Sequence, residues 1–282
     1  MVSSPAGPGA GASPGGDPDR ASIARVYDAA LGGTDNTEID RQVLEQVRAV
    51  APEVDDLAWS NRRFLARAVR FLAEQGGLHQ YLDCGSGLPT AENTHQIVRR
   101  TDREAGVVYV DNAPEVVAQG GALVAGDPRC RVVDADVFRP GEVLGNAVVR
   151  ELIDLAEPVA LLQVGTLHHL SGDGAAVMRQ YVDALAPGSW VVVAHFLDPG
   201  TDELSPLARR MEQVFLHSPM RSGWFRTRAE ITGFLPGLEI VPPGPGRAGE
   251  LEVCDLWWPD GPRLTPLSPV RQCVAGAVGR KP

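Results

Sequence analysis

Lysine is nearly absent from this chain of 282 residues, because Lys281 is its single lysine and arginine supplies the other positive charges. Acidic residues still outnumber basic ones, 36 to 26, which gives a formal net charge of −10. An acidic protein is not drawn non-specifically to nucleic acid or to anionic membranes, although a local basic patch is not excluded. We attribute the arginine bias to a GC-rich genome and expect no nucleic acid and no membrane as partners.

Paired cysteines and long apolar runs are also missing. The four cysteines, Cys84, Cys130, Cys254 and Cys273, are scattered without a Cys-x-x-Cys pair, and no signal peptide is evident. We therefore expect reduced thiols in a soluble, cytoplasmic protein. No uninterrupted apolar run approaches the roughly 20 residues of a membrane-spanning helix. The histidines lack a helical His-x-x-x-His spacing, so we expect no metal site.

Three segments of different composition follow one another. Residues 1–20 are rich in Pro, Gly, Ala and Ser without apolar periodicity, which predicts a disordered tail. Residues 21–77 show helical periodicity. Residues 78–282 alternate short apolar strands with helices, which predicts a Rossmann-like, doubly wound and mostly parallel α/β sheet. We expect helices near 23–31, 38–50, 56–75, 90–101, 114–124, 142–155, 174–186, 202–216 and 227–235, and strands at 79–84, 107–111, 130–134, 158–164, 188–196, 238–242 and 271–279.

A glycine-rich turn follows the first predicted strand. The run from Asp83 to Gly87 reads Asp-Cys-Gly-Ser-Gly, and Gly-x-Gly at a strand-to-helix turn lets the backbone approach a nucleoside-containing ligand closely. Pro89 suits the first turn of the helix expected next. Alone, such a turn is as typical of an ordinary strand–helix connection as of a ligand-binding turn. The choice between the two depends on the residues that end the neighbouring strands.

Carboxylates follow the second and third predicted strands. Asp111, beside Asn112, ends the second strand, where a carboxylate can accept hydrogen bonds from both ribose hydroxyls. Asp111 can equally cap the helix that starts at Pro114. Asp136 follows the third strand, where its carboxylate can accept from an adenine amino group while the N–H of Val137 reaches a ring nitrogen.

Two details favour S-adenosylmethionine (SAM) over a dinucleotide as the ligand of this turn. A pyrophosphate site calls for Gly-x-Gly-x-x-Gly, and Thr90 stands at the third glycine position. Asp83 places a negative charge where a pyrophosphate would lie. That charge repels phosphate but attracts the ammonium group of a methionyl moiety.

Histidines follow the fourth and fifth predicted strands, whose ends border the ligand crevice of such a sheet. His168 and His169 come after the fourth strand and His195 is near the end of the fifth. We select His168 and His195 as candidate catalytic residues that orient or deprotonate an acceptor. Each of these histidines can equally be a polar residue that packs beside the core and has no catalytic role.

Several runs resemble class I SAM-dependent methyltransferases, and more narrowly an actinobacterial S-adenosyl methyltransferase family formerly described as a domain of unknown function. The likeness covers roughly residues 21–280, with Cys84 and Ser86 as small departures. The matching runs are 24–28 (Ala-Arg-Val-Tyr-Asp), 31–36 (Leu-Gly-Gly-Thr-Asp-Asn), 61–65 (Asn-Arg-Arg-Phe-Leu), 82–90, 108–112 and 185–189.

The resemblance implies a seven-stranded sheet that ends in an antiparallel hairpin, with SAM as cofactor and S-adenosylhomocysteine (SAH) as product. It implies that residues 21–77 form a helical lid, closed over the site by Tyr27 and the loop at 32–36. Inserts near 202–270 would shape the acceptor pocket, and Trp257 and Trp258 there are either an aromatic box or core. The predicted cofactor-binding residues are Tyr27, Asp83, Cys84, Gly85, Ser86, Gly87, Asp111, Asn112, Asp136, Val137, Val164 and Gly165.

These expectations combine into one functional hypothesis. The chain transfers a methyl group from SAM to an oxygen or nitrogen of a small-molecule acceptor, whose identity the sequence does not give. Two alternatives stay open: a non-catalytic protein that binds SAM or SAH, and an NAD-dependent oxidoreductase. The oligomeric state stays unknown.

Overall fold

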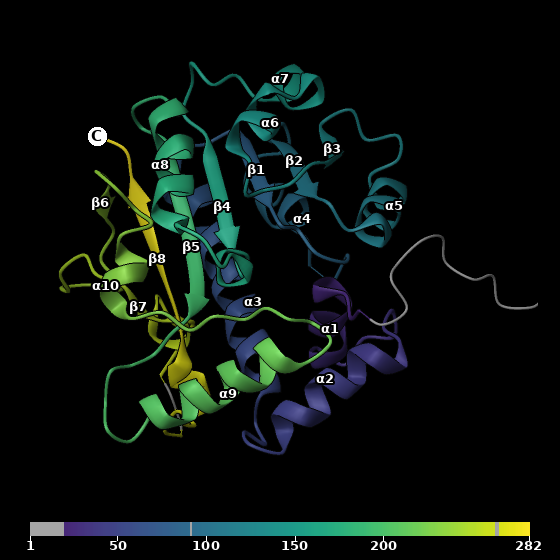
Figure 1. Cartoon of the computed structure of the whole chain (residues 1–282). Coiled ribbons are helices and arrows are strands. Elements are labelled where there is room, and N and C mark those ends of the chain that lie inside the picture. Colours follow the sequence, from purple (N-terminus) through teal and green to yellow (C-terminus); the bar gives the residue numbers. More distant parts are fainter. Residues whose placement is uncertain (1–19, 91, 263–264) are drawn as a thin grey trace, which may run out of the picture.

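The computed structural model describes residues 20–90, 92–262 and 265–282 (Figure 1). Apart from Arg20, the predicted tail at 1–20 lies outside the described residues. The described chain begins with three helices, α1 (Ile23–Ala30), α2 (Glu38–Arg48) and α3 (Asp55–Phe71). A π-helical turn at Leu72–Gly76 continues α3 and ends at Gly77, whose φ of 60° favours glycine.

An eight-stranded sheet forms the centre of the rest of the described chain. Five parallel strands stand in the order β3-β2-β1-β4-β5, then β8 follows β5, and both β6 and β7 pair with β8. All pairs made by β8 are antiparallel. The strands are β1 (Gln80–Cys84), β2 (Gly106–Asp111), β3 (Cys130–Asp134), β4 (Ala160–Val164), β5 (Trp190–Phe196), β6 (Glu239–Ile240), β7 (Glu252–Val253) and β8 (Val274–Arg280).

Helices cover both faces of this sheet because its central strands are apolar on both sides. Leu162 and Val192 belong to a core shared with α2 and α3, whereas Leu161 and Val193 belong to the core of the opposite face. The remaining helices are α4 (Thr94–Val98), α5 (Pro114–Leu123), α6 (Pro140–Gly145), α7 (Ala147–Leu152), α8 (Gly174–Ala184), α9 (Ser205–His217) and α10 (Arg228–Thr232).

The predicted doubly wound fold is confirmed, and the seven predicted strands are present. β7 is an eighth strand that the sequence analysis did not predict, because two residues carry no recognisable alternation. Thr227 and Glu230 form the capping box of α10. No helix within the described ranges is long and apolar enough to cross a membrane.

Two predicted helices are wrong in extent. The helix expected at 90–101 begins only at Thr94, because Asn93 caps it, and Pro89 precedes it. The helix expected at 142–155 is divided into α6 and α7 by Asn146, whose extended backbone ends one helix while its side chain accepts from the N–H of Val148 to start the next.

The switch in strand order between β1 and β4 determines where a ligand can bind. Sheets of this topology bind ligands outside the carboxyl ends of their strands, at the point where the order reverses. Figure 1 shows β4 and β5 pointing toward the layer that contains α1, α2 and α9. The N-terminal helices therefore lie over the edge of the sheet at which a site is expected.

Candidate active site

The glycine turn after β1 has a geometry that requires glycine. Gly85 and Gly87 have φ values of 71° and 66°, a region that side chains rarely adopt. A Cβ on Gly85 would lie 2.0 Å from Cγ2 of Thr166, which follows β4. The N–H groups of Gly85 and Ser86 donate to the carbonyl of Val110 in β2. The turn is thus held against both neighbouring strands.

Asp111 fastens this turn from the end of β2. Its Oδ2 accepts from the N–H of Gly87 at 3.0 Å, and its Oδ1 accepts from the N–H of Ala113 at 3.0 Å. Burial raises the pKa of this carboxyl group. Asp111 therefore fixes the glycine turn together with Ala113, the residue before α5. It does not itself cap this helix, because the N-cap is Ala113 and no side chain caps it, which corrects that alternative.

Asp83 is a second buried carboxylate at the same turn. Its Oδ2 accepts from Oγ1 of Thr94, the first residue of α4, at 2.6 Å. Burial raises its pKa to about 6, although the hydrogen bond from Thr94 opposes the shift. A cationic ligand group would relieve the cost of this buried negative charge.

Asn61 connects α1 to the end of β4. Its Nδ2 donates to the hydroxyl of Tyr27 in α1, and that hydroxyl donates to the carbonyl of Ala58. A Cβ on Gly165 would lie 2.9 Å from the same Nδ2. Oδ1 of Asn61 is buried and has no hydrogen-bond partner among the described residues. An acceptor atom of this kind is available to a ligand.

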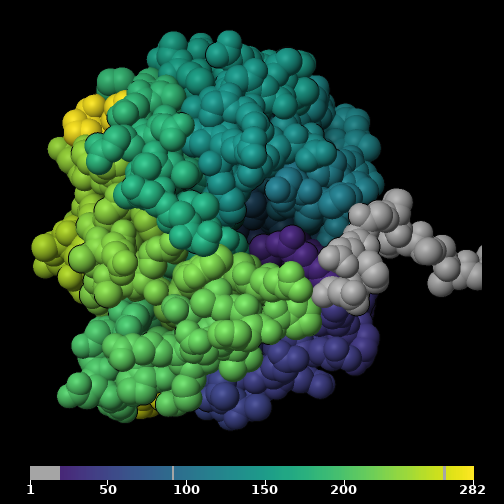
Figure 2. Space-filling model, viewed as in Figure 1, coloured from purple at the N-terminus to yellow at the C-terminus, as the bar shows by residue number. Residues whose placement is uncertain are grey.

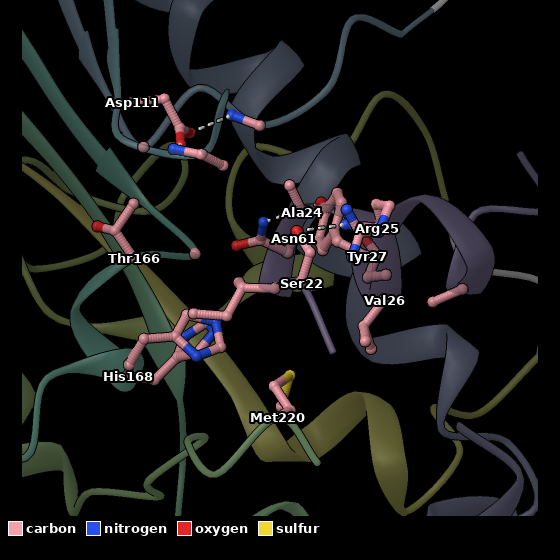
Figure 3. A pocket seen from close by; sticks show the side chains of 18 of the residues that line it. Ser22, Ala24, Arg25, Val26, Tyr27, Asn61, Asp111, Thr166, His168 and Met220 are labelled. Carbon is pink, nitrogen blue, oxygen red and sulfur yellow. Dashed lines mark hydrogen bonds between the residues drawn. The ribbon is translucent and has the colours of Figure 1, made fainter. Parts of the chain in front are cut away.

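These residues surround one cavity of about 480 Å³, a size common for small-molecule sites. Figure 2 shows the hollow between α9 and the part of the molecule at the carboxyl ends of β1 and β2, which we call the strand-end half. The N-terminal helices form part of its wall. In Figure 3, Asp111 lies at one end, His168 and Met220 lie at the other, and α1 residues from Ala24 to Tyr27 line one side.

His195 does not line this cavity, which corrects its selection as a catalytic candidate. Its Nδ1 lies 2.7 Å from the carbonyl of Phe196 and must donate to it, and its Nε2 lies 2.9 Å from Nη1 of Arg226 and must accept. Both nitrogens are therefore used. Burial, together with the charge of Arg226, lowers its pKa to about 3.

His168 and His169 both line the cavity. The ring of His168 stacks on Phe196, its Nδ1 is buried without a partner in the described chain, and burial lowers its pKa well below the usual value. Nδ1 of His169 lies 2.8 Å from Oγ of Ser222. Both rings are thus neutral at pH 7 at the wall of the cavity.

Residues 11–282 match the model of a protein family described as S-adenosyl methyltransferase. The chain belongs to the S-adenosyl methyltransferase family. As a member of it, the chain is a SAM-dependent methyltransferase, and the alternatives of an NAD-dependent oxidoreductase and a non-catalytic binding protein are set aside.

Two solved structures resemble this family member over nearly their full length. A protein from Thermobifida fusca YX, assigned to the methyltransferases, is 40% identical with a TM-score of 0.86, covering 94% of this chain and 96% of its own. A DUF574 family protein from Streptomyces avermitilis MA-4680 is 30% identical with a TM-score of 0.84, and the match covers 94% of this chain and 98% of that protein. A search among curated proteins finds no match.

The cavity of this methyltransferase fits SAM on three observations. The turn at Gly85 leaves no room for a side chain. The carboxylate of Asp83 is buried beside the turn, where it suits an ammonium group and repels a phosphate. The buried Oδ1 of Asn61 lacks a partner within the described residues. Among those residues, no group of three His, Cys, Asp or Glu side chains is placed to hold a metal ion.

Most of the predicted site residues lie together in the methyltransferase cavity, but two cofactor candidates do not line it. Cys84 points to the opposite face of the sheet, where its Sγ is 4.0 Å from the hydroxyl of Tyr181. Asp136 accepts from the N–H of Phe138 and so closes its own turn. The predicted residues that line the cavity are Tyr27, Asp83, Gly85, Ser86, Gly87, Asp111, Asn112, Val137, Val164, Gly165 and His168.

Only part of the segment predicted as a lid borders the cavity. α1 lines the cavity, but the loop at 32–36 does not, because it folds around Asp28, whose Oδ2 accepts from Asp35 and Asn36. From the predicted insert region, Phe215 and Met220 line the cavity. Trp257 is core instead, packed edge-on against the rings of Phe64 and Phe71.

Several cavity residues were not predicted from the sequence. Asn61 stands in a run matched to the family, so a signal for it existed. His169 was considered and then left out of the selected catalytic residues. Arg25 likewise stands in the matched run 24–28, whereas Thr166 and Glu115, the ion-pair partner of Arg25, carry no motif that could have revealed them.

Proposed function

We propose that this methyltransferase transfers the methyl group of SAM to an oxygen or nitrogen of a small-molecule acceptor that enters the same cavity. One observation carries the proposal: a single cavity includes both the polar strand ends and an apolar region under the lid. When bound, SAM supplies an electrophilic methyl group on a sulfonium. The chain's own residues bind the two molecules and align them, and alignment supplies much of the acceleration in such displacements.

The strand-end half of the cavity holds SAM in this proposal. Asp111 accepts hydrogen bonds from ribose hydroxyls through lone pairs that the N–H groups of Gly87 and Ala113 leave free. Asp83 faces the methionyl ammonium. The backbone of Val137 borders the adenine, while Asp136 does not line the cavity.

The other half holds the acceptor. His168, selected from the sequence, and its neighbour His169 line this half. Both rings are neutral at pH 7, so an unprotonated nitrogen of each can accept a hydrogen bond and orient the acceptor. A base is required only if the acceptor arrives protonated. His195 has no part in this step because its two ring nitrogens are occupied.

Calorimetric titration of the purified chain with SAH, SAM and NAD in parallel tests the cofactor half of the proposal. We expect micromolar binding of SAH and SAM and none of NAD. Asp111→Ala should weaken SAH binding at least tenfold, since it removes the ribose contacts and loosens the glycine turn. Asp134→Ala is the matched control, because Asp134 is the exposed residue paired in register with Asp111 on β3.

The acceptor half is tested by SAH release from SAM in the presence of small-molecule and macromolecular fractions of a cell extract. Release that depends on the small-molecule fraction supports the proposal. Binding of NAD alone, or release driven only by macromolecules, would overturn it.

A further inference from the structure

The acceptor end of the cavity, which we define as the part lined by Leu57, His168, His169, Phe215 and Met220, is built from apolar and aromatic side chains. These residues come from α3, from the turn after β4, from α9 and from the segment that follows α9. Figure 3 shows His168 and Met220 facing this end, away from Asp111. An apolar enclosure of this kind selects an acceptor by shape and by the few polar groups it contains.

The wall of the acceptor end is aromatic, with its rings stacked on one another. The rings of His168 and Phe196 have centroids 3.7 Å apart and planes within 10°. Phe196 also lies nearly parallel to Phe215, at 5.7 Å and 18°, and to Phe225, at 4.9 Å and 27°. Because aromatic rings gain most from offset stacking or edge contacts with other rings, such a wall favours a flat, unsaturated ligand.

The acceptor end offers no negative charge to a ligand. Among the described residues that line the cavity, the carboxylates are Asp83, Asp111 and Glu115. Asp83 and Asp111 stand at the carboxyl ends of β1 and β2, and Glu115 is paired with Arg25. A cationic amine buried beside Phe215 would therefore lack a counter-charge, which is costly in an apolar environment. The enclosure suits an uncharged molecule.

His169 supplies one polar group of this end, beside the ring nitrogens of His168. Its Nδ1 is 2.8 Å from Oγ of Ser222, and Nε2 has no hydrogen-bond partner among the described residues. Burial lowers the pKa of this ring to about 3, so it is a neutral imidazole at pH 7. When Nδ1 carries the proton and donates it to Ser222, Nε2 is a hydrogen-bond acceptor.

We propose that the acceptor is an uncharged, flat aromatic compound with a ring hydroxyl, which donates a hydrogen bond to Nε2 of His169 while its ring lies against the wall of His168 and Phe196. Ser222 is a positioning residue, because it orients His169 without touching the acceptor. This inference rests on the proposed function, since the same cavity must hold SAM beside the acceptor.

Four compounds with the same fused two-ring carbon skeleton are titrated into the full chain saturated with SAH. They test whether the ligand must be flat, uncharged and able to donate a hydrogen bond. The probe 2-naphthol is flat, uncharged and carries the hydroxyl. Decahydro-2-naphthol keeps the hydroxyl but is not flat, 2-methoxynaphthalene is flat but cannot donate, and 2-(aminomethyl)naphthalene carries a positive charge. By calorimetry we expect 2-naphthol to bind about tenfold more tightly than each of the others, the factor typical of one lost buried contact.

A double-mutant cycle then assigns the hydroxyl contact to His169. His169→Asn should weaken 2-naphthol about tenfold and leave 2-methoxynaphthalene within about twofold, because only 2-naphthol uses Nε2. Ser222→Ala should give the same pattern with a smaller loss. His217→Asn, at an exposed histidine of α9 outside the cavity lining, should change neither. SAH affinity measured on each variant reports whether its fold is intact.

Failure of the inference can be told apart from failure of the proposed function. If SAH does not bind to the wild-type chain, the proposed function falls and the inference falls with it. If SAH binds but the amine or the saturated alcohol binds as tightly as 2-naphthol, only the inference is overturned. Equal weakening of 2-naphthol and 2-methoxynaphthalene by His169→Asn would overturn the assignment of the hydroxyl to this residue.

Discussion

The guanidinium of Arg25 in α1 lies 2.9 Å from the carboxylate of Glu115 in α5, and both residues line the cavity. Nε of the same guanidinium donates to Asp40 of α2. Asp40 also accepts from the N–H of Ser22 and from Thr37, so its buried carboxylate organises the start of α1. α1 is thus connected through one arginine both to α2 and to α5, which follows β2.

Glu115→Gln should speed the release of SAH while leaving the fold stable. The side chains of Arg25 and Glu115 are 21% and 22% exposed, so their loss should cost the free energy of unfolding no more than about 1 kcal/mol. A freer α1 should raise the SAH dissociation rate roughly three- to tenfold, measured by stopped-flow displacement. Glu142→Gln, in an ion pair on α6 outside the cavity lining, should change nothing. An unaltered rate in Glu115→Gln would contradict this role.

Gly85→Ala should lower both stability and SAH affinity, and Thr166→Ser should partly restore them. The added Cβ would meet Cγ2 of Thr166 at 2.0 Å in a backbone with φ of 71°. We expect a loss of about 2–4 kcal/mol in urea unfolding, from the clash and the left-handed backbone together. Serine removes Cγ2 and keeps the hydroxyl that donates to Gln163. A double variant no more stable than Gly85→Ala would mean that backbone strain, not the clash, dominates.

SAH binding should weaken as the pH falls through 6. Burial raises the pKa of Asp83 to about 6, and only its ionised form attracts an ammonium group. The ionised fraction falls about tenfold between pH 7 and pH 5, so the affinity should fall by a similar factor. Calorimetry at pH 5, 6 and 7 measures this. Asp83→Asn should bind weakly and equally at each pH, whereas a variant that keeps the full pH dependence would refute the role of Asp83.

The buried histidines should make the fold sensitive to acid. Burial lowers the pKa of His169 and His195 to about 3, whereas an unfolded histidine titrates near 6.5. Between these values the unfolded chain binds more protons, so stability decreases as the pH is lowered. Each ring should cost about 2 kcal/mol at pH 5 relative to pH 7. In urea unfolding, His195→Gln should shrink the difference between the two pH values by that amount; an undiminished difference would show that His195 titrates normally.

The sheet and the glycine turn were predictable because their signals are local. Val107, Val108 and Val110 of β2 read as a buried strand, and glycine at 85 and 87 reads as a turn whatever surrounds it. The length of α4 was not predictable from apolar periodicity, since the cap formed by Asn93 with Gln96 decides where it starts.

The catalytic candidates were harder to predict, because a position at a strand end does not determine the direction in which a side chain points. Arg226 is 31 positions after His195 in the sequence, yet its guanidinium occupies the ring nitrogen that a base would need. His169 faces the cavity because Ser222, 53 positions away, holds its other nitrogen. Such long-range pairs leave no pattern in a single sequence.

The packing of α3 on β8 links the completion of the cavity to the order in which the chain folds. Asp56 of α3 pairs with Arg271, 215 positions later, and Phe64 fills the space above Gly276 that a Cβ would need. Contacts of such sequence separation form late and slow the folding rate. α3, which lines the cavity, lacks the surface on which it packs until β8 has paired with β5. During refolding, the ability to bind SAH should therefore return only in the final kinetic phase.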